Sequence, residues 1–147
     1  MVNTMSPSRL LASLALAAFA ATCAHAGPVR ADHPLLGTWK LPIPDTTCVE
    51  TYRLRADGTS LVTSADEVSE TEFELADQPS EKGFYKWVDK LTKDNGKKDC
   101  SGQITEPGHV STFYISMHPS GDMFFMCEAE DLKACMGPFI RVKGSAI

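Results

Sequence analysis

The chain has 147 residues with 14 Lys or Arg and 19 Asp or Glu, which gives a formal net charge of −5. Nucleic-acid-binding domains need a basic face, so this balance argues against nucleic acid as a partner. A chain of this length is expected to form one domain with a modest hydrophobic core.

Residues 1–26 have the three parts of a secretory signal peptide. Arg9 precedes an apolar run over residues 10–21, and Ala24-His25-Ala26 forms a small-x-small cleavage site. The apolar run is too short to span a bilayer comfortably, so we expect export without stable membrane insertion. We therefore expect a single mature domain over residues 27–147, either periplasmic or secreted. Loss of Arg9 with the leader makes its charge −6.

The cysteines predict a disulfide framework. Cys23 belongs to the leader, and Ala20 does not suit lipoprotein processing at that cysteine. Four cysteines remain, an even number typical of disulfides in an exported chain. No Cys-x-x-Cys is present, which argues against a zinc ribbon or a redox pair. Of the three possible pairings we favour Cys48–Cys100 and Cys127–Cys135, each stabilising by about 2–4 kcal/mol.

Short segments rich in β-branched and aromatic residues are separated by turn residues, as in an all-β sandwich or barrel. Asp57-Gly58 and Asn95-Gly96 are strong hairpin turns, and the second is predicted to join residues 84–93 to 97–102. Residues 84–97 also fit helical spacing, but the alternation of Tyr85 and Trp87 favours a strand. The eight or nine predicted strands are residues 37–41, 48–55, 59–64, 71–75, 84–93, 97–102, 110–117, 123–127 and 139–143.

Gly37-Thr38-Trp39 opens the first predicted strand, and Arg141 lies in the last. This pairing resembles the lipocalin-like, or calycin-type, families of small exported β-barrels. The resemblance implies an antiparallel up-and-down barrel of about eight strands, with its core over about residues 35–143. It also implies that Trp39 lies across the closed end and that Arg141 packs over the indole, so both residues are structural. A guanidinium over an indole gains cation–π and packing energy. No activity follows from the resemblance.

The aromatic residues either fill a solid core, the simpler expectation for so short a chain, or line a cavity. Small eight-stranded barrels can hold one small ligand. If a cavity exists, Tyr52, Trp87 and Tyr114 are the expected ligand-binding residues, because each joins an apolar body to a polar tip. Binding of a small apolar ligand is the first functional hypothesis.

An acidic strand face supports a second hypothesis. Phe73 and Leu75 are expected to face inward, while Glu70, Glu72 and Glu74 face outward. Such a row could dock a basic protein, for example as an inhibitor of a basic periplasmic or secreted enzyme. The alternative is a solvated face that protects an edge strand.

Residues 123–126, Met-Phe-Phe-Met, are apolar on both faces. A half-exposed strand alternates, so this segment predicts an outer cover. Either the Cys127–Cys135 loop or a second subunit in a homodimer would supply it.

Catalytic and metal-binding patterns are not found in the sequence. His33, His109 and His118 are the only histidines after the leader, and His33 is expected in a loose N-terminal segment. There is no Gly-x-Ser-x-Gly or His-Glu-x-x-His motif. We expect a protein that is not an enzyme and uses neither cofactor nor metal.

Overall fold

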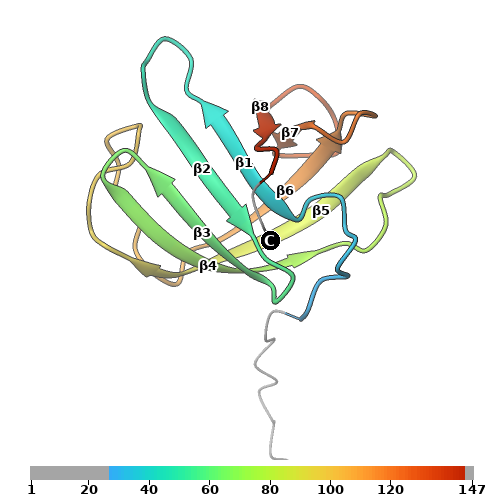
Figure 1. Cartoon of the computed structure of the whole chain (residues 1–147), viewed down its shortest axis with the longest axis horizontal. Helices are drawn as coiled ribbons and strands as arrows, with labels where there is room; N and C mark the ends of the chain where they lie inside the picture. Colours follow the sequence, from blue (N-terminus) through green and yellow to red (C-terminus); the bar gives the residue numbers. More distant parts are fainter. Residues whose placement is uncertain (1–26, 145–147) are drawn as a thin grey trace, which may run out of the picture.

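The computed structural model describes residues 27–144, so the predicted signal peptide lies outside the described residues. All regular secondary structure in the described part is β (Figure 1). No helix able to cross a bilayer occurs within residues 27–144. The strands are β1 Gly37–Pro42, β2 Val49–Leu54, β3 Thr59–Ser64, β4 Glu67–Leu75, β5 Phe84–Asp94, β6 Val110–Met117, β7 Met123–Cys127 and β8 Cys135–Arg141.

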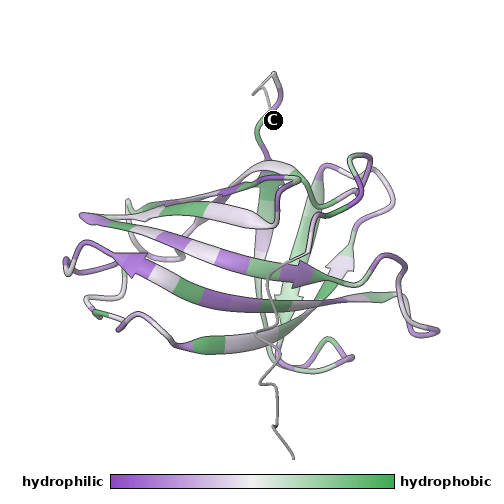
Figure 2. Cartoon of the chain, turned by 90° about the horizontal axis from the view of Figure 1, so that it is seen from below, coloured by the Kyte–Doolittle hydropathy of each residue, from purple (hydrophilic) through white to green (hydrophobic). Residues whose placement is uncertain are grey.

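The eight antiparallel strands close into one barrel, which confirms the predicted fold class. Each strand pairs with the next along the chain, and β8 returns to β1 with Trp39 opposite Arg141. Polar and apolar residues alternate along the strands (Figure 2). On β4, for example, Thr71 and Phe73 are buried while Glu72 and Glu74 are exposed. This period-two alternation separates an interior from a solvated outer surface.

One end of the barrel is packed solid with aromatic rings. Trp39 meets Phe124 edge-on at 4.7 Å, and Phe124 stacks on Phe139 at 4.5 Å between ring centroids. Tyr52 continues the series, with its ring centroid 5.2 Å from that of Phe139. Edge-to-face and stacked pairs at these distances stabilise a core beyond simple area burial.

Arg141 seals this end. Its guanidinium carbon lies 4.1 Å from the centroid of the Trp39 indole. The guanidinium also donates hydrogen bonds to three backbone carbonyls, those of Pro34, Leu36 and Gly121. A Cβ on Gly37 would lie 3.0 Å from the Arg141 Nη1 atom, and Gly37 has a φ of +120°. Glycine is therefore needed where the backbone meets the guanidinium, and the packing expected for Trp39 and Arg141 is confirmed.

The segment before β1 covers the same end, so the expectation of a loose N-terminus at His33 was wrong. Val29 N–H donates to the Ala56 carbonyl in the β2–β3 turn, and Leu35 and Leu36 are buried. His33 is 3% exposed, and both of its ring nitrogens form hydrogen bonds. Its Nδ1 accepts from the Leu35 N–H, and its Nε2 donates to the Ala76 carbonyl. Figure 1 shows this segment in blue beside the β2–β3 turn.

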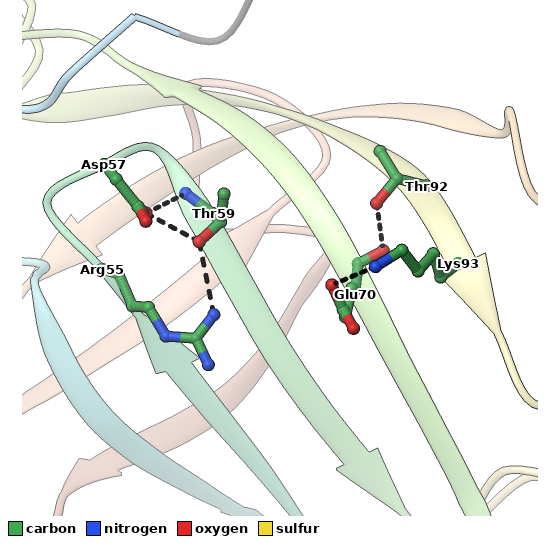
Figure 3. A network of polar contacts seen from close by, with 6 residues as sticks. All are labelled: Arg55, Asp57, Thr59, Glu70, Thr92 and Lys93. Atoms are coloured by element: carbon green, nitrogen blue, oxygen red, sulfur yellow. Dashed lines mark hydrogen bonds and ion pairs between the residues drawn. The ribbon is translucent and has the colours of Figure 1, made fainter.

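The β2–β3 turn is the predicted Asp57-Gly58 hairpin. Gly58 has a φ of 81°, and the Asp57 carboxylate accepts hydrogen bonds from both the N–H and the hydroxyl of Thr59. Arg55 Nη1 donates to the Thr59 hydroxyl from the outer side (Figure 3). These bonds, led by that of the Thr59 hydroxyl, lower the pKa of Asp57.

Asn95-Gly96 forms a turn, but the predicted strand over residues 97–102 was wrong. The Asn95 side chain donates to the Asp66 carbonyl, and the N–H of Cys100 donates to the Ser64 hydroxyl. Cys100 is also bonded to Cys48. These links hold the segment against the β3–β4 end, so β5 pairs with β6 instead. Residues 84–94 are strand, as favoured over a helix.

Both predicted disulfides are confirmed, Cys48–Cys100 and Cys127–Cys135. They fit an oxidising, exported environment, since disulfides persist where thiols are not kept reduced. The second bridge joins the start of β8 to the end of β7, so β8 begins four residues earlier than residue 139.

The outer face of residues 123–126 is only partly covered. Phe125 lies against Gly137, where a Cβ would come within 2.9 Å of its ring, and Phe125 remains 40% exposed. Ile140 on the neighbouring strand is also exposed. The Cys127–Cys135 loop therefore does not cover this patch fully, and the homodimer stays a prediction.

Arg141→Ala is expected to lower the free energy of unfolding by about 2–4 kcal/mol, because it removes the cation–π contact and leaves three carbonyls without their donor. Arg141→Lys should recover only part of the loss, since an ammonium lacks the planar fork. Urea unfolding with intact disulfides measures both. Lys143→Ala, which breaks only an exposed ion pair with Asp122, should cost less than about 0.5 kcal/mol. Equal effects at positions 141 and 143 would contradict the sealing role of Arg141.

Candidate functional site

The barrel is hollow at the end opposite Trp39. A cavity of about 680 Å³ extends from the middle of the barrel to the loops after β1 and β5. Cys48–Cys100 ties these two loops together. Part of the cavity surface is apolar, from Leu41, Val62, Trp87, Leu91, Phe113 and Met126. The interior is therefore not filled by aromatic residues throughout.

Two of the three predicted ligand-binding residues line this cavity. They are Tyr52 on β2 and Trp87 on β5, and Trp87 is 2% exposed. Tyr114 is not among the lining residues, whereas its neighbour Phe113 is. Adjacent residues of a strand point to opposite faces. Because Phe113 pairs with Trp87 and faces inward, Tyr114 is placed on the other face, paired with Lys86.

Glu50 anchors the first acidic group of the cavity. Its two carboxylate oxygens accept hydrogen bonds from the Tyr52 hydroxyl at 2.5 Å and the Ser64 hydroxyl at 2.6 Å. Burial is the main reason why the pKa of Tyr52 is raised well above its usual range, and the nearby Glu50 carboxylate adds to the effect. The phenol consequently keeps its proton and acts as a donor to Glu50.

Asp89 on β5 forms the second group. Its Oδ1 accepts from the Thr71 hydroxyl at 2.7 Å and from the Trp87 indole N–H at 3.3 Å. The Thr71 hydroxyl lies 2.7 Å from that of Ser60. Burial raises the pKa of Asp89, while the bonds from Thr71 and Trp87 act in the opposite direction.

Glu67 and Asp94 form the third group at the β3–β4 end. Glu67 lines the cavity and is 8% exposed. Burial, and next the adjacent Asp94 carboxyl, raise the pKa of Glu67 to about 7. The Oδ2 atom of Asp94 is buried and has no hydrogen-bond partner within the described residues.

A β-bulge turns Asp94 inward. Ser69 pairs with Asp94 and Glu70 with Lys93, but Thr71 pairs with Leu91, so Thr92 is the extra residue on β5. The Thr92 hydroxyl donates to the Glu70 carbonyl at the bulge (Figure 3). One extra residue reverses which face the following side chains take.

The acidic row on the outer face of β4 lies beside lysines. Glu70 is 3.1 Å from the Lys93 ammonium, and Glu72 pairs across the strands with Lys90. Glu74 is exposed opposite Val88. Cross-strand pairs of opposite charge stabilise a sheet, and here they reduce the net negative charge that the row presents to a partner.

The inward acids could have been found from the sequence, but only in part. Each acid lies an even number of residues from an inward-facing aromatic residue on the same strand. The pairs are Glu67 with Phe73, Glu50 with Tyr52, and Asp89 with Trp87. Alternation alone therefore places these three acids inside. Asp94 has the opposite parity to Trp87, so only the bulge brings it to the interior.

Comparison of the chain with known protein families, curated proteins and solved structures found no match. Within residues 27–144, no group of three or more His, Cys, Asp or Glu side chains is arranged to hold a metal ion. The function is therefore argued from the chemistry of the cavity.

Glu67→Gln is expected to be more stable than wild type by about 1–3 kcal/mol at pH 8. The native state binds the Glu67 proton more tightly than the unfolded chain, whose pKa is 4.5 against about 7 when folded. Wild-type stability should therefore fall as pH rises from 4.5 to 7, and the variant should lose this dependence. Urea unfolding between pH 4 and 8 measures it, with exposed Glu72→Gln as the control. A pH profile identical in all three proteins would exclude a buried, protonated Glu67.

Proposed function

We propose that this protein is an exported binding protein, periplasmic or secreted, that holds one small molecule with an apolar body inside the barrel. The observation that carries the proposal is the cavity of about 680 Å³. Its volume lies in the range typical of small-molecule sites, about 300–1,000 Å³. Trp87 and Phe113 supply aromatic surface, while convergent polar groups offer orientation and specificity.

The architecture suits a preformed site. The solid end around Trp39 and Arg141 makes a floor, and eight hydrogen-bonded strands make the wall. The Cys48–Cys100 bridge restrains the loops at the mouth. A site held rigid before binding loses less entropy when the ligand enters. The proposal agrees with the resemblance to lipocalin-like barrels noted from Trp39 and Arg141.

Docking of a basic protein on Glu70, Glu72 and Glu74 is the weaker proposal. Lys93 and Lys90 lie opposite the first two of these residues and compensate their charge. No feature of the described surface favours such a partner over the cavity ligand.

Blocking the cavity should abolish binding of a neutral apolar probe. Wild type is expected to enhance the fluorescence of N-phenyl-1-naphthylamine, and Val62→Trp on the inner face of β3 should weaken the affinity at least tenfold. Thr63→Trp, on the outer face of the same strand, should change it less than twofold. Circular dichroism establishes that both variants fold.

A second readout keeps the test independent of packing changes. Trp87→Phe should remove most quenching of protein fluorescence by the probe, because Trp87 lies in the cavity wall, while the probe itself still binds. Absence of probe binding to wild type, or equal binding by the two tryptophan insertions, would overturn the proposed function.

A further inference from the structure

The hydroxyl groups next to Glu50 and Asp89 already donate their hydrogens within the protein. A hydroxyl has one hydrogen to donate, and an ionised carboxylate can only accept. Tyr52 and Ser64 both donate to Glu50. These groups therefore offer a ligand lone pairs rather than hydrogens.

The hydrogen bonds around Asp89 are also donated toward the carboxylate. Thr71 spends its hydroxyl hydrogen on Asp89 Oδ1, so Ser60 must be the donor in the Ser60–Thr71 contact. The Trp87 N–H points to the same oxygen of Asp89. Each hydrogen bond in this series is donated toward the Asp89 carboxylate. Both bonds that reach the carboxylate end on Oδ1, so Oδ2 of Asp89 receives neither.

Glu67 has another acid, Asp94, as its hydrogen-bonded neighbour. Glu67 lines the cavity and is 8% exposed. Asp94 carries a buried oxygen that has no hydrogen-bond partner within the described part of the chain. Two neighbouring buried acids cannot both ionise without a large cost, and a bound cation would relieve that cost.

The cavity itself supplies no such cation. Glu50, Glu67, Asp89 and Asp99 line it, but no Lys or Arg does, and His109 is the one basic side chain among the lining residues of the described chain. The positive charges of β5, such as Lys90 and Lys93, lie on the outer face. The interior thus carries an excess of acidic over basic side chains.

We propose that the ligand is an organic cation, a primary ammonium group joined to an apolar or aromatic body. This inference rests on the proposed function and specifies the chemical class of the ligand. The ammonium has three donors and no acceptor, which matches the carboxyl oxygens that Glu67 and Asp89 contribute to the cavity lining. The apolar body would lie against Trp87 and Phe113, whose ring faces also attract cations.

Other cations fit the same wall less well. A quaternary ammonium has no N–H to give to the buried oxygens. A metal ion needs several ligands converging on one point, and the described residues hold no such group. Burial and the neighbouring Asp94 carboxyl raise the pKa of Glu67, and a cation beside this pair of acids would stabilise their charged form.

Isothermal titration with three matched probes tests the inference: 4-phenylbutylamine, 4-phenylbutanol and 4-phenylbutyrate. The amine is expected to bind at least tenfold more tightly than the alcohol, and the acid most weakly. Glu67→Gln and Asp89→Asn should each reduce the amine affinity at least tenfold and leave the alcohol within twofold. Exposed Glu72→Gln is the matched control and should change nothing.

The outcomes separate this inference from the proposed function. If N-phenyl-1-naphthylamine binds in the cavity but the three probes bind alike, the proposed function stands and the cationic ligand is wrong. Unchanged amine binding in both Glu67→Gln and Asp89→Asn would also overturn it, as would displacement of the amine by millimolar calcium. If neither the naphthylamine nor any of the three probes binds, the proposed function itself fails.

Discussion

The barrel depends on the contact between Arg141 and Trp39. The guanidinium covers the indole and binds carbonyls of the N-terminal segment and of the β6–β7 turn, so one side chain joins the first strand, the last strand and two loops. A closed barrel has no free strand edge, and this contact lies at the β1–β8 seam where closure occurs. The stacked rings of Phe124 and Phe139 then fill the space beneath it.

Because this end is solid, the other can be hollow. The aromatic series that begins at Trp39 ends at Tyr52, whose hydroxyl turns from packing to polar contact by binding Glu50. Beyond Tyr52, toward the open end of the barrel, carboxylates and hydroxyls on β2 to β5 join apolar residues in the lining. The aromatic packing is concentrated in one half of the barrel, which leaves the other half able to hold buried acids that a packed core would exclude.

Much of this fold follows from local patterns in the sequence. Strand-forming runs between turn residues predict β3, β6 and β7 at their observed bounds, and the resemblance carried by Gly37, Trp39 and Arg141 predicts which end is closed. The predictions fail where long-range links override local signals. Asn95-Gly96 indicates a hairpin, but Cys100 is bound to a distant loop. Tyr114 has the chemistry of a ligand contact, yet the pairing of Phe113 with Trp87 decides which of the two faces inward.

The bulge at Thr92 decides the electrostatic sign of the interior. If Thr92 paired with Glu70 in a regular register, Lys93 rather than Asp94 would lie opposite Ser69 on the inner face. A lysine there would bring its ammonium beside Glu67 and supply a cation to the cavity from within the chain. The bulge instead leaves the lysine outward, where it pairs with Glu70 (Figure 3). A shift of one residue in strand pairing can therefore switch such a barrel between self-neutralised and open to a charged guest.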